Sequence, residues 1–420
     1  MKIVLANRYF HPDQSATSRM VSSLAFALAE RGFSVTALAC RHFHDTSDIV
    51  LPAREAINGV SVHRLWTSGF GRRGMMNRAG DYATFHLSAM AWFLLHARAR
   101  DLCVVCTDPP LLGVSAAAPL AIRGARLVNW IMDLFPETAV ELGVLSRGGG
   151  LDRFATSLRD AALKRSDLTI CPIHSMANYL EQRGTIPRKL ATVHHWSDEK
   201  EIRPIHPEDN PLREEWKLKE KFIVGYSGNF GRAHEFATLL DTAEKLRGYD
   251  DIRFLLIGDG QQRAFTELEV QRRGLTNVLF KQYQPAERLA QSLSVADVHI
   301  VSLLPALEYC IVPSKFYGVL AAGRPTIFVG DQQGEVASVS RRAHCGEAVA
   351  PGDSTAMAAI IMRLRGSSVR RSRMGENARQ LLESEYMLRH GVDRWQAAVS
   401  HLLPKVALAS LSPLPGKAAL

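Results

Sequence analysis

Long apolar runs are scarce in this sequence, and it does not begin with a secretion signal. The longest candidate membrane segment runs from Phe85 to Leu95, far short of the roughly 20 apolar residues that a helix needs to cross a bilayer. The first ten residues, MKIVLANRYF, carry a single lysine before a short apolar run, which is typical of a first β-strand and not of a signal peptide. We therefore expect a protein that is not integral to a membrane.

Cysteine is also sparse, and its spacing argues against a metal or redox site. Cys103 and Cys106 form a CxxC pair, a spacing found in zinc sites and thiol oxidoreductases. The pair lies in LCVVCT, an apolar run in which residues three apart point to opposite faces of a strand. No second CxxC follows. The sequence predicts buried, reduced thiols for its six cysteines, at positions 40, 103, 106, 171, 310 and 345.

The charge balance argues against a nucleic-acid-binding protein. The net charge is +9, and most of the basic excess lies in the first half of the chain. Such a mild excess suits an anionic small ligand or an anionic membrane surface, but it is too diffuse for nucleic acid, and zinc-finger, RNP and basic-helix patterns are lacking. With 46% hydrophobic and 22% charged residues, the composition is that of a globular enzyme.

Strand and helix patterns alternate through two successive stretches of the chain. At 420 residues the chain exceeds the roughly 250–300 residues at which one core stops growing. Apolar β-branched runs alternate with helical periodicity, a pattern typical of βαβ units and a parallel sheet. The proline-rich segment RPIHPEDNP, residues 203–211, interrupts the pattern. The sequence predicts an α/β protein with two doubly wound domains at 1–204 and 212–385, a closing helix at 386–403 and a disordered tail at 404–420.

The elements expected in the two stretches can be assigned individually. Helices are expected near 15–31, 82–99, 111–123, 151–164, 174–183, 234–247, 261–273, 285–293 and 314–322. Strands are expected at KIVLAN, SVTALAC, GVSVHRL, LCVVCT, RLVNWIM, DLTICP, KFIVGYS, IRFLLIG, NVLF, ADVHIVSL, RPTIFVG and EAVAP. Doubly wound sheets bind ligands at the carboxyl ends of their strands, so the segments that follow the strands are the places to search for chemistry.

Two glycine-containing turns follow strands in the second half. In YSGNFGRAHEF, Gly228 and Gly231 allow the backbone to approach a ligand closely. The helix after the turn offers free N–H groups to an anion, and Asn229, Arg232 and His234 add donors. The alternative is a tight structural turn with solvated polar residues. The second turn, IGDGQ, has Gly258 and Gly260, and it is a weak signal by itself.

A third segment, VPSKFYGVLAAGRPTIFVG, is more informative. Pro313 and Ser314 open a helix, with proline near the first turn and serine in capping range. Lys315 then lies in the first turn, where the helix dipole disfavours a cation unless an anion is also present. This arrangement favours diphosphate binding, and the alternative is an exposed lysine without a role.

The order of these segments resembles the retaining GT-B glycosyltransferases of the large bacterial family 4 type. The motifs that carry the resemblance are YFHPDQSATSRM, TDPPLLG, WIMDLFPE, SGNFGRAH, IGDG and VPSKFYGVLAAGRP, and they extend from Met1 to about Leu403. Each is weak alone, and their order and spacing are specific. The branch is similar to the colanic-acid and O-antigen enzymes, including fucosyltransferase-type members. The resemblance implies two Rossmann-like domains facing a cleft and transfer of a sugar, with retention, from a nucleoside diphosphate to a hydroxyl.

The resemblance implies roles for residues of the first domain. The loop 12–17 would face the donor diphosphate and the acceptor, with Ser15 in a place where relatives often have a Gly-Gly pair. Asp133 would position or polarise the reacting sugar or the acceptor hydroxyl, and the alternative for it is a helix N-cap. The candidates for acceptor binding are His11, Asp108 and Glu137.

The resemblance also implies donor contacts in the second domain. Asn229 and His234 take the places of the arginine and lysine that hold the diphosphate in many relatives, with Arg232 between them. The paired glutamates of the family fall on Cys310 and Gly318, so both are missing here. The remaining donor candidates are Gly228, Gly258, Gly260, Pro313, Ser314 and Tyr317, with Tyr283 near the base and Glu335 near a ribose or sugar hydroxyl.

The expected chemistry is electrostatic catalysis without a metal or other cofactor. The sequence has neither an HExxH motif nor a DxD loop near the second-domain motifs. Lys315, Arg232 and helix N-termini would therefore stabilise the leaving diphosphate, and Asp133 completes the catalytic candidates. A carboxylate placed as a covalent nucleophile is not identifiable, so front-face departure and attack are expected.

The segment before the second predicted helix suggests contact with a membrane. Arg64, Arg72, Arg73 and Arg78 are interleaved with Trp66, Phe70, Met75 and Met76, and the stretch 56–80 contains no acid. Basic and aromatic residues beside an apolar helix suit an anionic inner leaflet and a lipid-linked saccharide acceptor. We expect a cytoplasmic, peripheral protein, and the alternative is a surface loop beside a core helix. Two other functions stay open, a nucleotide-sugar 2-epimerase and a catalytically silent GT-B subunit that only binds a partner or nucleotide.

Overall fold

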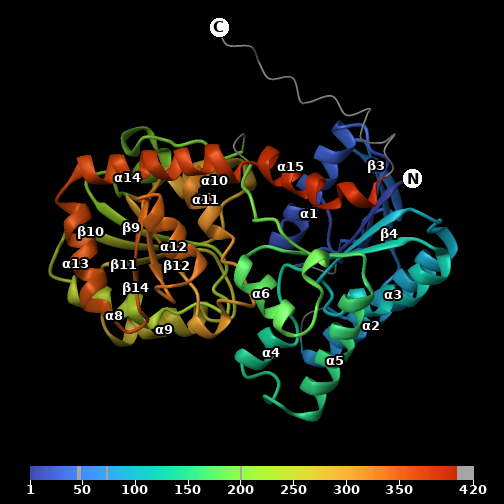
Figure 1. The fold of residues 1–420 in the computed structure, drawn as a ribbon. Coiled ribbons are helices and arrows are strands. Elements are labelled where there is room, and N and C mark those ends of the chain that lie inside the picture. Colours follow the sequence, from blue (N-terminus) through green and yellow to red (C-terminus); the bar gives the residue numbers. More distant parts are fainter. Residues whose placement is uncertain (45–48, 72–73, 199–200, 404–420) are drawn as a thin grey trace, which may run out of the picture. The chain divides into compact units, whose positions relative to one another are not determined.

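The computed structural model describes residues 1–44, 49–71, 74–198 and 201–403, and it comprises two compact units (Figure 1). The first unit contains Met1–His194 and the described residues from Gly391 onward, and the second contains His195–His390. The chain thus changes unit at His195, before the proline-rich segment, and returns to the first unit within the last helix.

The first unit is built on a sheet of eight strands in the order β3-β4-β2-β1-β5-β6-β7-β8. Every neighbouring pair is parallel except β3 and β4, which are antiparallel. The carboxyl ends of β1, β5 and β6 are therefore neighbours at one edge of the sheet. The strands are β1 (Ile3–Ala6), β2 (Val35–Cys40), β3 (Arg54–Ile57), β4 (Val60–Leu65), β5 (Leu102–Cys106), β6 (Arg126–Trp130), β7 (Leu168–Cys171) and β8 (Leu190–Thr192).

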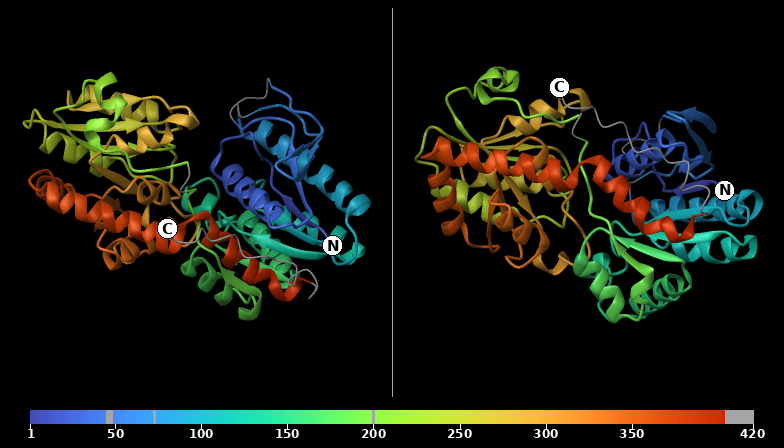
Figure 2. Two further views of the ribbon diagram at one scale, coloured as in Figure 1. Left: turned by 90° about the horizontal axis from the view of Figure 1, so that it is seen from above. Right: turned by 45° about the horizontal axis from the view of Figure 1, so that its top comes forward.

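Helices cover both faces of this sheet. The α2, α3 and α5 helices lie side by side, and α1 lies on the opposite face (Figures 1 and 2), as right-handed crossovers on the two sides of β1 require. The last helix, α15, joins α1 through Arg31, which donates to Asp393 at 2.5 Å and to Gln396 at 2.8 Å. The helices are α1 (Ala16–Glu30), α2 (Met75–His96), α3 (Leu112–Arg123), α4 (Glu137–Glu141), α5 (Gly150–Arg165), α6 (His174–Gln182) and α15 (Leu388–Val399).

The second unit has a wholly parallel sheet of six strands in the order β11-β10-β9-β12-β13-β14. Helices α8 and α13 contact each other, and so do α11 and α14. The strands are β9 (Phe222–Ser227), β10 (Ile252–Ile257), β11 (Val278–Lys281), β12 (Val298–Ser302), β13 (Thr326–Val329) and β14 (Gly346–Val349). The helices are α7 (Pro211–Glu215), α8 (Ala237–Lys245), α9 (Arg263–Arg272), α10 (Leu289–Ser294), α11 (Lys315–Ala321), α12 (Glu335–Arg342), α13 (Ser354–Arg365) and α14 (Ser368–Leu381), followed by a π-helical turn at Leu382–Tyr386.

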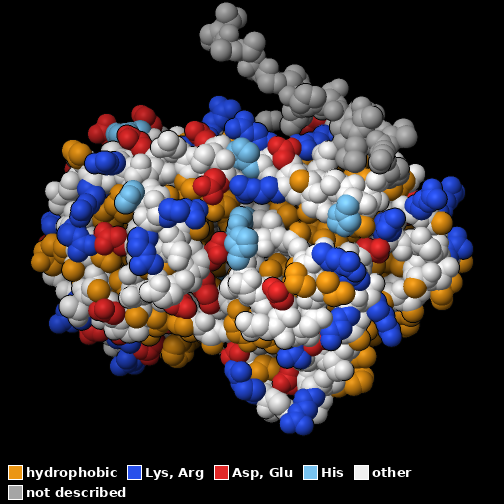
Figure 3. Space-filling model, viewed as in Figure 1, with side chains coloured by type: hydrophobic (Ala, Val, Ile, Leu, Met, Phe, Trp, Pro, Cys, Tyr) orange, Lys and Arg blue, Asp and Glu red, His pale blue; other side chains and the backbone are white. Residues whose placement is uncertain are grey.

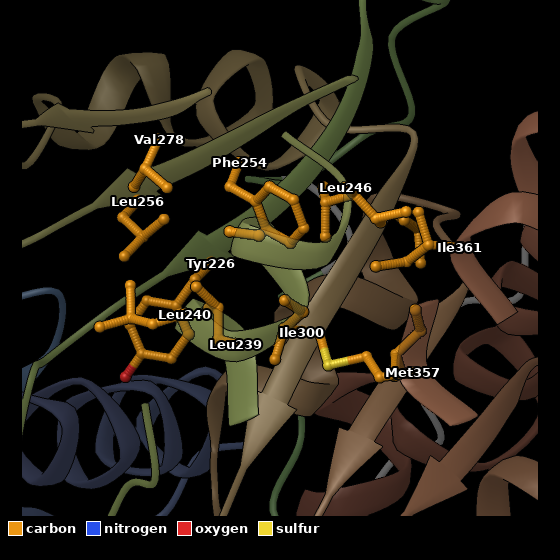
Figure 4. Close-up of a cluster of buried hydrophobic side chains, with 14 of the residues drawn as sticks. Tyr226, Leu239, Leu240, Leu246, Phe254, Leu256, Val278, Ile300, Met357 and Ile361 are labelled. Atoms are coloured by element: carbon orange, nitrogen blue, oxygen red, sulfur yellow. The ribbon is translucent and has the colours of Figure 1, made fainter. Parts of the chain in front are cut away.

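The main hydrophobic core of the second unit lies between the sheet and the helices α8 and α13. Figure 4 shows Tyr226, Phe254 and Ile300 of the strands beside Leu239 of α8 and Ile361 of α13. Strands buried on both faces consist of nearly continuous apolar residues, which is why β9, β10 and β12 could be recognised in the sequence. Tyr226 places its ring in this core and its hydroxyl at the strand end, where the candidate site begins.

The predicted α/β class with two doubly wound parallel sheets is confirmed. Two strands were not predicted, β3 and β8, because they are short edge strands whose residues are all exposed or half-buried, so neither contains a buried apolar run. The helix predicted near 82–99 begins at Met75. Its first two turns are mostly exposed or half-buried, so they lack the apolar periodicity that marked the rest.

The expectations about cysteine and charge agree with the structure. All six cysteines are free and buried. On the face seen in Figure 3, basic side chains are spread among acidic and uncharged ones. Within the described residues, no helix combines the length and the apolar character that crossing a bilayer requires.

Candidate functional site

Glycine turns form the carboxyl edge of the second sheet between β9 and β10. Gly228 and Gly258 have φ angles of 145° and 137°, which residues with a side chain rarely adopt. A Cβ atom added at Gly258 would lie 2.0 Å from the carbonyl oxygen of Gly228. Gly260 has φ 143°, and its Cβ would lie 2.3 Å from Oδ1 of Asn229. These glycines are required because the two turns cross at backbone contact distance.

Two side chains that the sequence analysis did not select hold these turns together. Gln262 donates from Nε2 to the carbonyl oxygens of Gly231 at 2.6 Å and of His234 at 2.9 Å. Arg263 donates to the carbonyl oxygens of Gly258 and Lys281, the latter at 2.9 Å. The turn after β9 is thereby fixed from the start of α9. Gln262 lies two residues after Gly260 of the IGDG turn, and this proximity was the only signal in the sequence.

Lys315 lies in a polar cluster beside the first turn. Its Nζ donates to the Tyr226 hydroxyl at 2.5 Å and lies 3.2 Å from Nε2 of His234. It also stands 4.1 Å from the centre of the Tyr226 ring. An added Cβ at Gly228 would lie 3.2 Å from Cε of Lys315, so a side chain at 228 would press on the lysine. Among the described residues, no carboxylate oxygen lies within ion-pair distance of this amine.

The surroundings of the Lys315 cluster disfavour positive charge. Burial lowers the pKa of Lys315 well below its ordinary value. Burial, and second the nearby Lys315 amine, lower the pKa of His234 to about 3. Burial also raises the pKa of Tyr226, with a smaller contribution from Tyr283. The cluster therefore contains hydrogen-bond donors and an amine that can take up a proton, but no anion. A bound anion is stabilised most in such surroundings.

The start of α11 differs in one detail from the expectation. Ser314 precedes the helix, as expected, but its side chain makes no capping hydrogen bond and is exposed, so the predicted cap is wrong. Pro313 is buried beside it. Tyr317 is buried on the same helix and packs edge-on against Tyr386, with ring centres 5.2 Å apart. These contacts favour a packing role for Tyr317 over a donor contact.

The positions of the missing glutamates are occupied by core residues. Cys310 is buried, and an added Cβ at Gly318 would lie 3.3 Å from Cδ1 of Leu293. A different carboxylate lies close by, which the sequence analysis missed. Oε1 of Glu308 accepts from the backbone N–H of Glu335 at 2.6 Å. This contact ties the loop after β12 to the start of α12.

The Glu308 side chain can reach the start of α12 because the residue before this helix, Gly334, has no side chain. An added Cβ at Gly334 would lie 2.3 Å from the carboxyl carbon of Glu308. Burial, and in smaller measure the charges of Asp331 and Glu335, raise the pKa of Glu308 to about 7, against the opposing effect of the Glu335 N–H. The carboxylates of Glu308 and Glu335 are close enough for the charge of Glu335 to act on Glu308, and both are candidates to accept sugar or ribose hydroxyls.

The remaining donor candidates lie around the same edge. Asn229 is exposed, and its carbonyl oxygen accepts from the Tyr226 hydroxyl at 2.7 Å. Arg232 is exposed two residues after Phe230 in the same turn. Tyr283 follows β11 and is also exposed. The structure thus brings the predicted residues of the segments after β9, β10 and β11 to one edge of the second sheet, together with Lys315.

In the first unit, two aspartates follow neighbouring strands. Asp108 follows β5 and Asp133 follows β6. The backbone N–H of Asp133 lies 3.3 Å from Oγ1 of Thr107. Desolvation by the surrounding protein, and second the charge of Asp108, raise the pKa of Asp133 to about 6. The Asp133 side chain is exposed, and the direction of this shift favours the protonated acid.

Asp133 is not a helix cap, because the N-cap of α4 is Pro136. The loop after β1 is arranged around another aspartate, Asp13, which the sequence analysis did not select. Asp13 accepts from the hydroxyl of Ser15 at 2.5 Å and from the backbone N–H of His44 at 2.6 Å. His11 precedes this turn, and its backbone N–H donates to Ser22 at 2.9 Å. The contacts of Asp13 fix the start of α1.

The surroundings of Glu137 favour a structural role over acceptor binding. Its carboxylate receives two hydrogen bonds from Arg159, at 2.7 and 2.9 Å, and one from the hydroxyl of Tyr179 at 2.7 Å. Burial opposes ionisation, but Arg159 and Tyr179 outweigh it and hold the pKa of Glu137 below its ordinary value. Both oxygens are occupied within the fold, so we remove Glu137 from the acceptor candidates.

With this geometry established, the chain can be compared with known proteins. Residues 208–381 match the family Glycosyl transferases group 1, and residues 15–196 match the Glycosyl transferase 4-like domain. The chain is a glycosyltransferase of the GT-B fold. The two matched segments of the glycosyltransferase contain both strand edges described above.

Similar proteins support this assignment. WbjE of Pseudomonas aeruginosa, assigned as a glycosyltransferase, is 25% identical over 73% of this chain and 76% of its own length. WcaI of Escherichia coli (strain K12), assigned as a colanic acid biosynthesis glycosyl transferase, is 26% identical over 51% of this chain, and the match spans only 54% of WcaI. The fold resembles Anabaena Alr3699/HepE in complex with UDP and glucose, with a TM-score of 0.72, 12% identity, and coverage of 96% of this chain and 100% of that one.

Proposed function

We propose that this glycosyltransferase moves a sugar from a nucleoside diphosphate sugar to a hydroxyl of a lipid-linked saccharide, with retention, during synthesis of a surface polysaccharide. Two similarities support the proposal. WcaI is assigned to colanic acid biosynthesis, and HepE, which shares the fold, binds UDP and glucose. The cysteines and the charge distribution of this chain are compatible with a small anionic donor.

The observation that carries the proposal is the Lys315 cluster at the carboxyl edge of the second sheet. An ammonium group has three donors, and Tyr226 and His234 receive two of them. The third is available for a phosphate oxygen. Burial makes the bare ammonium unfavourable, so an anion beside it is stabilised by more than a surface charge pair would be.

The reaction breaks the bond between the anomeric carbon and the diphosphate oxygen, and the bonding electrons remain on that oxygen. Lys315 and Arg232 would stabilise the developing charge with fixed donors, which is the role of preorganised electrostatics in group transfer. The acceptor hydroxyl attacks the same face of the sugar, and the departing phosphate oxygen receives its proton. Asp133, at the edge of the first sheet, would orient the acceptor hydroxyl.

The other residues at the second edge would bind the donor. Gly228, Gly258 and Gly260 allow the two turns to cross closely, and the diphosphate would lie beside these turns. Tyr283 would stack on the base, since it is exposed at the end of β11. Glu308 and Glu335 would accept hydroxyl groups of the ribose or the transferred sugar.

The test is to incubate the protein with a panel of nucleoside diphosphate sugars, with and without a lipid-linked saccharide acceptor. We expect nucleoside diphosphate to be released only when acceptor is present, and proton NMR to show that the anomeric configuration of the donor is kept. Conversion of the donor to a new nucleotide sugar without acceptor, and without net release of nucleoside diphosphate, would indicate epimerase chemistry. Binding of the donor without any turnover would indicate a silent subunit. Inversion at the anomeric carbon would contradict the proposed mechanism.

A further inference from the structure

A stripe of exposed apolar side chains runs along the outside of α2 in the first unit. Three large side chains mark its length: Met76 is 84% exposed, Leu87 65% and Leu95 74%. The residues between them on the same face are small or apolar, and they recur every three or four positions, as one face of a helix requires. The full stripe consists of Met76, Ala79, Ala83, Leu87, Ala91, Leu94 and Leu95, all exposed.

Two exposed aromatic side chains extend this stripe. Trp66 is 67% exposed and Phe70 62%, and the loop that carries them is bound along α2. The carbonyl oxygen of Trp66 accepts from Ser88 of the helix at 2.8 Å. The ring of Phe70 stands over Gly80, where an added Cβ would lie 3.0 Å from it.

The loop is anchored by Asp81, the single acidic residue between positions 56 and 100. Asp81 is buried, and its carboxylate accepts from the hydroxyl of Ser68 and the backbone N–H groups of Phe70 and Gly71, at 2.9–3.2 Å. It also pairs with Arg8 at 3.1 Å. The one negative charge of this segment is therefore neutralised inside the fold.

The charges left around the stripe are basic. Arg98 and Arg100 are exposed at the end of α2, and Arg78 lies partly exposed near its start, 3.2 Å from the Tyr82 hydroxyl. The structure corrects the expectation for Arg64, which is buried, donates to the carbonyl oxygen of His11 at 2.6 Å and pairs with Glu55. The other two expected arginines, Arg72 and Arg73, lie outside the described residues.

We propose that the stripe on α2, with Trp66 and Phe70, is the surface by which this protein rests on an anionic phospholipid bilayer. From position 76 to position 95 the helix extends roughly 28 Å at about 1.5 Å per residue, so it can lie in the plane of the interface. Apolar side chains, interfacial aromatic residues and basic flanks without exposed acids are the features by which a helix binds an anionic surface. A protein partner would more commonly be met by mixed charges and polar groups around the apolar residues.

The same helix is joined to the candidate acceptor edge of the first sheet. Nε2 of His86 lies 3.1 Å from the carbonyl oxygen of Pro110, two residues after Asp108. The backbone N–H of Arg8, the partner of Asp81, donates to the carbonyl oxygen of Asp108 at 2.7 Å. Membrane contact through α2 would thus hold this edge close to lipid-linked acceptors. This last step rests on the proposed function, whereas the membrane contact does not.

The experiment is vesicle flotation of the full chain with phosphatidylcholine alone and with phosphatidylcholine mixed with phosphatidylglycerol. The test variant is Leu87→Gln with Leu95→Gln, and a second version carries Glu at both positions. The matched control is Phe265→Gln with Leu268→Gln, which changes two exposed apolar residues on α9 of the second unit. All the changed side chains are exposed, so the variants are expected to unfold at the wild-type temperature.

Wild type and control are expected to float with the anionic vesicles. Binding should weaken as salt rises, because the Debye length falls from about 10 Å at 0.1 M to about 3 Å at 1 M. The Gln variant should partition at least about tenfold less, since it loses the burial of two leucines, and the Glu variant should not float.

Equal flotation of wild type and the Leu87/Leu95 variants would overturn the proposal, and so would wild-type binding that is indifferent to lipid charge. Sedimentation of the same proteins tests whether a second copy of the chain, and not a membrane, covers the stripe. A dimer that dissociates in the Gln variant would show that a second copy covers the stripe. Thermal-shift titration with nucleoside diphosphate sugars reports separately on the donor site. If the wild type binds the donor but does not float, this proposal fails and the proposed function stands. If it floats but does not bind the donor, the proposed function fails and the membrane contact stands.

Discussion

Nε2 of His234 lies 3.2 Å from Nζ of Lys315. Nδ1 of the same ring lies 2.6 Å from the carbonyl oxygen of Ser302, which can only accept a hydrogen bond. The imidazole proton is therefore on Nδ1, and Nε2 accepts from the lysine. His234 is therefore not a direct ligand of the anion; it orients the amine of Lys315 through this hydrogen bond. This differs from the sequence-based expectation, in which His234 took the place of a cation on the diphosphate.

Replacement of Lys315 tests its contact with the donor. Lys315→Ala is expected to weaken binding of a nucleoside diphosphate by about tenfold to a hundredfold, because a hydrogen bond to a charged group contributes about 1.5–3 kcal/mol. Isothermal titration calorimetry measures this. Lys245→Ala is the control, because that lysine is exposed on α8 and binds Thr355 at 2.5 Å. Equal affinities in the two variants would remove Lys315 from the site.

Donor binding should be linked to uptake of a proton. Burial holds the pKa of Lys315 below the ordinary 10.5 in the free protein, and a bound diphosphate raises it again. Between these two pKa values the protein gains a proton on binding, so affinity falls by up to about tenfold per pH unit as pH rises. His234 stays neutral near pH 7, because its pKa is about 3. The lysine is therefore the expected source of the linkage.

Titration in buffers of different ionisation enthalpy measures the proton uptake directly. An intact nucleoside diphosphate sugar is the appropriate ligand, because its phosphates do not titrate near neutral pH. Wild type should take up a proton on binding at pH values between the two pKa values of the lysine, and Lys315→Ala should not. The same uptake in both proteins would show that another group is responsible.

The crossing of the two glycine turns predicts a large difference between two glycine substitutions. Gly258→Ala should destabilise the protein by more than the about 1–3 kcal/mol typical of backbone strain, because its Cβ would also lie 2.0 Å from the Gly228 carbonyl oxygen. Gly248→Ala is the control, because no atom lies within 4 Å of its added Cβ. Denaturant unfolding gives both values. Similar stability of the two variants would contradict the close crossing.

Replacement of Glu137 separates a structural role from acceptor binding. Glu137→Gln removes the bidentate partner of buried Arg159, which keeps its contact with Asp160 at 2.7 Å, so the loss of stability should be smaller than the about 3–5 kcal/mol of a buried charge left unpaired. Because the pKa of Glu137 is lowered in the folded state, its contribution is complete above its ordinary value of about 4.5 and is lost as pH falls. Glu181→Gln, which changes an exposed residue of α6, should have little effect. A higher KM for acceptor with unchanged stability would restore Glu137 to the site.

Activity is expected to persist in excess EDTA. The reason is the donor set, since the proposed diphosphate contacts are the nitrogen donors of Lys315 and Arg232, and Mg²⁺ requires oxygen ligands in octahedral arrangement. Turnover with and without chelator, and after addition of magnesium or manganese, measures this. If activity is lost completely on chelation and either metal restores it, the leaving diphosphate is stabilised by a metal ion and not by protein groups alone.

Much of the fold and part of the site could be predicted from the sequence because their causes are local. The apolar runs of β9 and β10 and the helical periodicity of α1 are properties of neighbouring residues. The glycine requirement after β9 and β10 and the lysine at the start of α11 are also visible as motifs. These features identify the strand edge at which Gly228, Gly258 and Lys315 meet.

Only the tertiary structure decided which side chains have partners elsewhere in the chain. Glu137 and Arg64 looked available in the sequence, yet Arg159 and Glu55, distant or on another strand, engage them inside the fold. Tyr226 reads as one apolar residue of a strand, and its hydroxyl gains importance only when Lys315, 89 positions later, reaches it. Backbone conformation follows from local sequence, whereas burial and pairing of polar groups depend on contacts that form only when the chain has folded.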